Sequence, residues 1–250
     1  MRVSILGALL LTLAPASALA RPTVLPDRTL RVDFAPTDFT ILNTGAIGGR
    51  RGFVVGSNAP DDPRIGMGLG LSLGLTGRAE AGILFLPLAL SPNNGYGDIT
   101  FHSRYRVLGG SFELALQLAV QIPTDTNFGL GLGAPIIFHL GNLDIETGAE
   151  LELIFSDNTV ANLDIPVSFL FDINRSLFFG VRTGFFFANI DNLYIPLGPV
   201  VGARIAMSGS LQLEPIAAFV FEQFVSTDGS GPIVTDVWTL QVGANLRFRL

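Results

Sequence analysis

The chain has 250 residues, of which 48% are hydrophobic and 14% are charged, and its 15 Lys and Arg side chains against 21 Asp and Glu give a net charge of −6. A net acidic chain argues against nucleic acid as a partner. The absence of cysteine excludes disulfides and thiolate metal sites. The spacing of the many apolar residues therefore carries most of the information about the fold.

The first twenty residues predict a cleaved secretory signal. Arg2 precedes an apolar run from Val3 to Leu13, and the segment ends in the small-residue sequence Ala18-Leu19-Ala20. The exported chain is expected to begin near Arg21. The run is too short to cross a bilayer as a helix, and every later apolar stretch is broken by polar residues, Gly or Pro.

From residue 63 onward, apolar and polar residues alternate with a period of two, which predicts one strand after another. The expected strands cover 63–75, 78–89, 97–107, 111–122, 128–140, 143–155, 161–173, 176–188, 195–207, 210–223 and 235–250. One more strand, near 49–55, makes the number even. Strands of about ten to thirteen residues are longer than those of soluble sheets and suit a tilted crossing of a bilayer.

The connections between these strands alternate in length. Tight turns are expected at 76–78, 108–110, 141–142, 174–175 and 208–209, and longer loops at 91–95, 123–127, 156–160, 189–194 and 224–234. Short turns on one rim and longer loops on the other are typical of transmembrane barrels.

The segment 65–76 indicates which face meets lipid. Its odd positions hold large apolar residues, and its even positions hold Gly, Ser and Thr. A soluble sandwich would turn these glycines toward water, whereas a barrel in lipid places large apolar residues outside and small or charged ones inside. Because an open sheet edge cannot persist in hydrocarbon, the sheet must close. The sequence predicts an all-β fold: a closed antiparallel transmembrane β-barrel of about twelve strands, within ten to fourteen, in an up-and-down meander.

The chain is expected to divide into a signal peptide at 1–20, an N-terminal periplasmic or lumen-entering segment at 21–44, and an outer membrane barrel at 45–250. Within the second part, Thr29 to Phe34 alternates like a strand, but Pro36 and the following Asn43-Thr44-Gly45 interrupt the pattern.

The final stretch from Trp238 to Leu250 places apolar residues at alternate positions and resembles the C-terminal assembly signal of Gram-negative outer membrane proteins, although that signal usually ends in Phe. The resemblance implies the outer membrane of a Gram-negative bacterium as the location. Membrane lipids and the outer membrane assembly machinery are the expected partners, together with a small-molecule cargo.

The segment from Gly95 to Thr124 has Gly95, Gly97, Asp98, Arg104 and Tyr105 in place. It resembles the Gly-x-Gly-Asp strand and basic-Tyr pair of the outer membrane proteins associated with phenol meta-pathway degradation. The stretch from Ile65 to Leu88 is similar to the same family. The resemblance implies an outer membrane barrel that passes small hydrophobic or aromatic molecules.

In this orientation, many polar side chains are expected to line the lumen. They are Asp98, His102, Arg104, Arg106, Glu113, Gln117, His139, Asp144, Glu146, Glu150, Glu152, Asp164, Arg182, Arg204, Glu214, Arg247 and Arg249. Three tight hairpins place a base opposite an acid, which predicts three pairs: Arg106 with Glu113, His139 with Asp144, and Arg204 with Glu214. We favour a role for these pairs in bracing the wall, and a role in ligand binding is the alternative.

The acidic residues Glu146, Glu150 and Glu152 lie on one expected strand and face the same way as Asp164 on the next. A row of carboxylates along a pore would concentrate cations, which predicts a weak cation preference if the pore is open. Alternatively, Arg182 or arginines across the lumen neutralise the row. No acidic loop has the ligand spacing of a Ca²⁺ site.

Apolar residues are also expected to face inward. They are Leu84, Leu86, Leu88, Ile137, Ile154, Leu170, Phe178, Phe186, Val200, Ile216 and Val220. They could form a slide for apolar cargo, or they could pack against residues 21–48 folded inside as a plug. Either arrangement favours a narrow or gated passage over a wide water-filled pore.

An enzymatic barrel would need a nucleophile beside a base. His102 is expected to point inward and Ser103 outward, because adjacent strand residues face opposite sides, and no histidine is expected opposite Ser72 or Ser168. No phosphate loop, dinucleotide fingerprint or zinc motif occurs, so neither catalysis, a metal nor a cofactor is expected. The expected function is passive passage of small molecules. The alternatives are a structural or surface-interaction barrel with a blocked lumen and a secreted soluble β-protein.

Overall fold

The computed structural model describes residues 22–34, 53–57, 63–91, 95–96, 99–123, 127–155, 159–227 and 238–250. For 53–57, 63–67, 85–91 and 95–96 only the backbone is described. The expected signal peptide at 1–20 and Asp98 lie outside these residues. No helix in the described part of the chain is long and apolar enough to cross a membrane.

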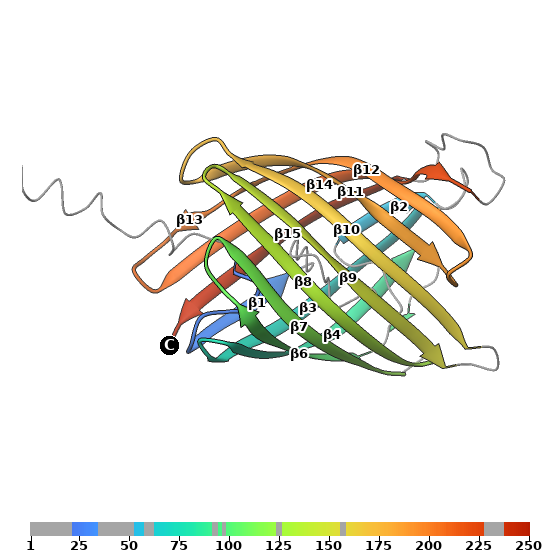
Figure 1. Ribbon diagram of the computed structural model, residues 1–250, viewed down its shortest axis with the longest axis horizontal. Helices are drawn as coiled ribbons and strands as arrows, with labels where there is room; N and C mark the ends of the chain where they lie inside the picture. The colour runs from blue at the N-terminus through green and yellow to red at the C-terminus, as the bar shows by residue number, and fades with distance from the viewer. Residues whose placement is uncertain are drawn as a thin grey trace, which may run out of the picture.

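The described strands form one antiparallel sheet that closes on itself (Figure 1). They are β1 Thr29–Phe34, β2 Phe53–Ser57, β3 Pro63–Thr76, β4 Ala79–Ser91, β5 Gly95–Tyr96, β6 Ile99–Leu108, β7 Phe112–Ile122, β8 Phe128–Leu140, β9 Leu143–Phe155, β10 Val160–Asp172, β11 Leu177–Ala188, β12 Asn192–Ala203, β13 Ile205–Ala206, β14 Leu211–Ser226 and β15 Trp238–Arg249. From β3 to β15 each long strand pairs with the next, and the short strands β5 and β13 extend the pairing on β4 and β14. The predicted up-and-down meander is confirmed.

The closing position of the wall lies between β15 and β3, and two separate strands fill it. Phe34 at the end of β1 lies opposite Ala244, and Phe53 at the start of β2 lies opposite Val242, so β2 continues where β1 stops. Both strands also pair with β3. Counted as one position, they give a closed barrel of twelve strands, as predicted.

This closure corrects the expected boundary at residue 45. Residues 29–34 belong to the barrel wall because they pair with β15 on one side and with β3 on the other. The strand expected near 49–55 is found at Phe53–Ser57, and residues 49–52 lie outside the described part of the chain.

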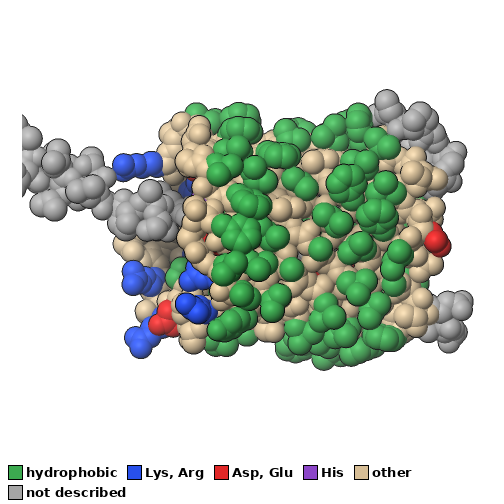
Figure 2. All heavy atoms as spheres, in the orientation of Figure 1, with side chains coloured by type: hydrophobic (Ala, Val, Ile, Leu, Met, Phe, Trp, Pro, Cys, Tyr) green, Lys and Arg blue, Asp and Glu red, His purple; other side chains and the backbone are tan. Residues whose placement is uncertain are grey.

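Alternation along β7 shows which face is outside. Leu116 is 55% exposed and Leu118 is 43% exposed, whereas the alternating residues Ala115, Gln117 and Ala119 are buried. Large apolar side chains cover the visible outer surface (Figure 2). An apolar exterior and a polar interior are what a barrel needs in lipid, since outward residues meet acyl chains. The fold is a closed antiparallel transmembrane barrel.

Aromatic side chains pair near both ends of the outer surface. At the short-turn end Phe112 and Phe138 form a tilted pair and Phe171 and Phe179 are stacked, and at the long-loop end Phe128 and Phe155 form a tilted pair and Phe219 is stacked with Trp238. Aromatic girdles at the two membrane interfaces are typical of transmembrane barrels. They mark the height of the wall that lies in hydrocarbon.

The connection between β11 and β12 is shorter than expected. It contains only residues 189–191 instead of 189–194, and the N–H of Asp191 donates to the carbonyl of Ala188 at 3.1 Å. Asn189 and Ile190 both have positive φ, at 51° and 59°. The twist of this turn conformation matches that of a hairpin, but isoleucine rarely adopts it. The residue types therefore gave no indication of a tight turn.

Candidate functional site: the barrel interior

Most of the side chains predicted to line the lumen are buried inside the barrel. The buried ones are His102, Arg104, Glu113, Gln117, Asp144, Glu146, Glu150, Glu152, Arg204 and Glu214, and the half-buried ones are Arg106, His139, Asp164, Arg182 and Arg247. Arg249 differs, because it lies at the end of β15 and is exposed at the rim. These polar groups form a charged ring and an acidic row, and inward apolar side chains form a third region, the apolar cluster.

The charged ring runs around the inside of the barrel at the short-turn end. One part of it begins at Glu113, whose carboxylate lies 3.8 Å from Arg106 and 3.8 Å from His139. His139 Nδ1 is 2.8 Å from Asp144 Oδ1, and these residues are direct neighbours across the β8–β9 hairpin. The predicted pairs of Arg106 with Glu113 and of His139 with Asp144 are therefore confirmed.

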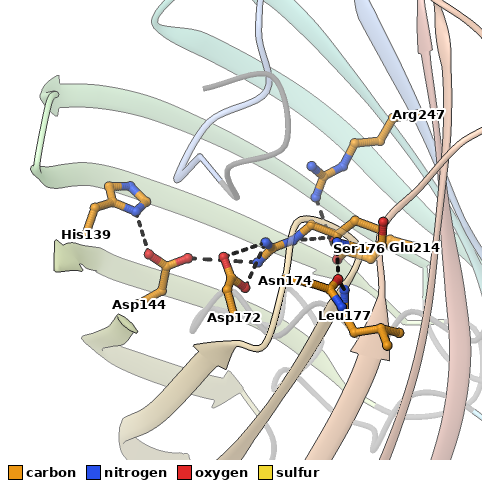
Figure 3. A network of polar contacts seen from close by, with 9 residues as sticks. His139, Asp144, Asp172, Asn174, Ser176, Leu177, Glu214 and Arg247 are labelled. Carbon is orange, nitrogen blue, oxygen red and sulfur yellow. Dashed lines mark hydrogen bonds and ion pairs between the residues drawn. The ribbon is translucent and has the colours of Figure 1, made fainter. Parts of the chain in front are cut away.

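Arg204 extends this ring to carboxylates on β9, β10 and β14. Figure 3 labels these three carboxylates, Asp144, Asp172 and Glu214, in the network. Its Nη1 donates to both carboxylate oxygens of Asp172 at 2.9 Å, Nη2 lies 4.0 Å from Asp144, and Nε lies 3.7 Å from Glu214. Glu214 in turn lies 3.9 Å from Arg247. The pair of Arg204 with Glu214 is confirmed, and the contact with Asp172 is new.

A turn fixes the position of Asp172 and Arg204. The Asn174 side-chain oxygen accepts hydrogen bonds from the N–H groups of Ser176 and Leu177, at 2.8 and 2.9 Å, which closes the connection between β10 and β11. The carbonyl of Ser176 then accepts a hydrogen bond from the N–H of Arg204 at 2.6 Å. The backbone thus holds the guanidinium beside its carboxylates.

The other part of the charged ring surrounds Glu80. Arg31 Nη2 lies 3.7 Å from the Glu80 carboxylate, and His102 Nε2 lies 3.5 Å from it. Arg31 Nε also donates to Asp33 Oδ2 at 3.0 Å, and its Nη2 donates to Ser72 Oγ at 3.2 Å. Since Arg31 and Asp33 lie on β1, the strand that sequence reasoning left outside the barrel supplies part of the ring.

The N-terminal segment 22–28 enters the barrel at this ring and joins its two parts. The backbone N–H and the hydroxyl of Thr23 both donate to Glu113 Oε2 at 2.8 Å, and the N–H of Leu25 donates to Glu80 Oε2 at 2.7 Å. Thr23 and Leu25 are fully buried. Hydrogen bonds to carboxylates are stronger than neutral ones, so the segment is held firmly.

Glycine at position 74 makes this entry possible. A Cβ atom on Gly74 would lie 1.9 Å from the carbonyl oxygen of Pro26, so any side chain there would push the segment away. At the adjacent turn, by contrast, a Cβ on Gly77 would meet nothing within 4 Å. The inward face of β3, whose small residues the sequence predicted to line the lumen, thus includes the surface on which the N-terminal segment packs.

The acidic row lies further from the short turns, on β9 and β10. Glu150 is directly opposite Asp164, and Glu152 is opposite Asn162, whose side-chain nitrogen donates to it at 2.7 Å. On the other side, Gly131 and Gly133 of β8 face Glu152 and Glu150. Asp164 also interacts electrostatically with Arg182 and Glu222. Part of the row is therefore compensated by Arg182, one of the two expected alternatives.

The apolar cluster occupies the interior side of β10 to β14. It consists of Leu170, Phe178, Val200, Ile216, Ala218 and Val220. Phe178 is 0% exposed, and a Cβ on Gly202 would lie 2.1 Å from its ring, so the ring packs directly on the wall. The Arg204 guanidinium lies 5.2 Å from the ring centroid, where a cation is favourable. Leu84 and Ile137 are buried elsewhere in the interior, and Ile154 and Phe186 are half-buried.

One group resembles a catalytic arrangement, and its geometry argues against that role. Ser72 Oγ lies 3.4 Å from His102 Nε2, so the expectation that no histidine faces Ser72 is wrong. His102 reaches it across Gly82, which separates them in the register and has no side chain to block the way. Ser72 and Glu80 approach the same ring nitrogen, and Nδ1 has no hydrogen-bond partner among the described residues. In the usual catalytic triad, an acid contacts one ring nitrogen of the histidine and the serine contacts the other.

Among the described residues, no cluster of three or more His, Cys, Asp or Glu side chains could hold a metal ion. The described interior thus offers charged pairs, hydrogen-bonded carboxylates and packed apolar side chains. This composition suits a passage lined by fixed charges.

No family model and no curated protein matches the chain. An outer membrane channel from Pseudomonas putida F1 has a similar structure, with 14% sequence identity, a TM-score of 0.55, and coverage of 90% of this chain and 96% of that one. A bacterial polysaccharide outer membrane secretin has 14% identity and a TM-score of 0.42, covering 88% and 70%, and a porin has 11% and 0.39, covering 76% and 63%. At 14% identity the similarity to the Pseudomonas putida F1 channel describes the fold alone, a closed antiparallel barrel.

Proposed function

We propose that the protein is an outer membrane barrel of a Gram-negative bacterium that allows small molecules to pass passively through a narrow lumen. The observation that carries this proposal is the burial of charged side chains inside a closed barrel whose outer face is apolar. Charged side chains inside a membrane barrel usually line a water-filled path or brace the wall. Passage of a small molecule requires only the water-filled path. The fold shared with the Pseudomonas putida channel supports the same reading.

The passage is narrow or gated. The N-terminal segment lies inside the short-turn mouth, bound to Glu113 and Glu80, and the apolar cluster fills one side of the interior. A wide water-filled pore would leave such side chains exposed. We therefore expect small solutes to pass and large ones to be excluded.

The cargo we propose is small and hydrophobic or aromatic. The resemblance of 95–124 to the family associated with phenol meta-pathway degradation suggests this class. Phe186 and Tyr194 are cross-strand neighbours toward the long-loop end and stack with ring centroids 6.2 Å apart, which supports it. Aromatic faces favour stacking with other rings. Catalysis is not part of the proposal.

Reconstitution in planar bilayers tests the passage. The full chain is expected to give small single-channel conductances, and liposomes containing it are expected to swell in small but not large solutes. Gly74→Ala, which displaces the N-terminal segment, is expected to raise the conductance, whereas Gly77→Ala on the adjacent turn is expected to leave it unchanged.

Two other functions make different predictions. A structural or surface-interaction barrel with a blocked lumen would give no conductance at any voltage, even with Gly74→Ala. A secreted soluble β-protein would not show the heat-modifiable migration in detergent gels that folded outer membrane barrels show.

A further inference from the structure

Among the described side chains, the exposed charges are unevenly distributed between the two ends of the barrel. Among the described residues, the exposed arginines are Arg28, Arg78, Arg175 and Arg249, and all four lie at the short-turn end. In Figure 2 the visible basic side chains gather at one end of the molecule, with an acidic side chain among them. A chain that is net acidic by six charges thus presents a basic rim on one side.

A hollow of about 270 Å³ lies within this rim, between two neighbouring hairpin turns. Its lining residues are Arg78, Arg106, Val107, Leu108, Gly109 and Gly110. The turns are joined directly, because the N–H of Arg106 donates to the carbonyl of Arg78 at 2.7 Å and its guanidinium donates to the carbonyl of Gly77. Both arginines therefore line the same opening.

The two arginines contribute differently to the hollow. Arg106 is partly neutralised, since its Nη1 lies 3.8 Å from the Glu113 carboxylate. Arg78 is exposed and lies on the turn itself. The hollow therefore has a net positive charge that comes mainly from Arg78, with Arg106 as a fixed second donor.

Apolar and aromatic side chains lie beside the hollow: Val107 and Leu108 are among its lining residues, and Tyr105 precedes Arg106 on the same strand. Tyr105 is 52% exposed, and Val107 and Leu108 are also exposed. Tyr105 is the residue directly opposite Ala79, the first residue after the turn that carries Arg78. Tyrosine at this height is typical of the boundary between acyl chains and headgroups, so the hollow lies at the level of lipid phosphates.

We propose that this hollow binds the phosphate of an anionic phospholipid in the leaflet that surrounds the short-turn rim. A guanidinium donates paired N–H groups to phosphate oxygens, and the acyl chains of the same lipid would lie along Tyr105, Val107 and Leu108. The proposal requires that the barrel lies in a membrane and is independent of whether its lumen conducts.

The test uses the full chain in an uncharged detergent and measures lipid adducts by native mass spectrometry. Phosphatidylglycerol is expected to bind more tightly than phosphatidylcholine with the same acyl chains. Arg78→Gln is expected to weaken phosphatidylglycerol binding about fivefold, the effect of one basic residue at a membrane surface. Arg78→Lys, which keeps the charge but loses the paired donors, is expected to be intermediate.

Arg175→Gln is the matched control, because it removes the same charge from the same rim outside the hollow. Equal losses of phosphatidylglycerol affinity for Arg78→Gln and Arg175→Gln would overturn the proposal. They would show that the whole basic rim attracts the lipid without a defined site. Equal binding of the two lipids, or displacement of phosphatidylglycerol by equimolar inorganic phosphate, would also overturn it. Added salt is also expected to weaken the binding of phosphatidylglycerol to the unmodified protein. Binding that does not change with salt would contradict the proposed site, and this test needs no variant.

Discussion

The two sides of the barrel interior are stabilised by different kinds of interaction. Along β10 to β14, Phe178 and its neighbours form an apolar cluster that resembles the core of a soluble protein. Along β1 and β3 to β9, buried acids are matched with arginines, histidines and the N–H groups of the N-terminal segment. Arg204 lies at the junction, with its guanidinium near both the Phe178 ring and three carboxylates.

The difference indicates where a solute could move. Close packing excludes water, so the apolar cluster leaves little room for a path along that side. On the polar side, the ion pairs are 2.8 to 4.0 Å long and involve groups that can exchange partners with water or with a solute. At the level of the apolar cluster we therefore expect the passage to follow the polar side, with the N-terminal segment at its mouth.

The largest expected effect concerns the apolar side. Phe178→Ala would leave a cavity in a close-packed region and is expected to destabilise the barrel by about 3–5 kcal/mol. Phe179→Ala is the matched control, because its ring is 48% exposed on the lipid face and lipid or detergent can fill the space. Urea unfolding of both variants in the same detergent measures the difference. Equal losses would show that Phe178 does not belong to a packed core.

A smaller loss is expected on the polar side. Glu113→Gln removes the charge that receives two hydrogen bonds from Thr23 and lies near Arg106 and His139. The expected cost is about 1.5–3 kcal/mol, the usual value of a hydrogen bond to a charged group.

Hydrogen exchange localises that loss. The Thr23 amide is expected to exchange faster in Glu113→Gln, and Glu152→Gln, a buried acid bonded to Asn162 instead, should leave it unchanged. Unchanged protection of Thr23 in Glu113→Gln would mean that other contacts hold the N-terminal segment.

The smallest expected effect concerns the acidic row. Glu150→Gln removes one of two carboxylates that face each other across β9 and β10. In bilayer recordings the ratio of cation to anion permeability is expected to fall by about twofold or less, because other fixed charges remain. Asp191→Asn, at an exposed turn, is the control. Equal passage of both ion signs in the unmodified protein would remove the predicted cation preference altogether.

Local alternation predicted the long strands well because a period of two is a direct consequence of facing lipid on one side only. Strand ends agree within about four residues, the usual limit for such boundaries. The three predicted charge pairs also followed from local rules, since each joins residues on the two arms of one hairpin.

The contacts that sequence reasoning missed join residues that no hairpin brings together. Asp172 lies on β10 and Arg204 follows β12, with β11 between them. Ser72 and His102 meet only because Gly82 on the intervening strand lacks a side chain. For β1, the described strand ends at Phe34, and nothing local indicated that Phe53 would start a second strand at the same wall position.

The way in which the wall closes has a consequence for folding. The pairing of β1 with β15 joins Thr29 to Arg249, and the N–H of Leu250 donates to the carbonyl of Arg28 at 2.8 Å. Bringing together residues so distant in sequence costs more chain entropy than zipping any hairpin. Every other strand can therefore pair before the barrel closes. The closing step requires β1 and β15, which are far apart in the sequence, to meet.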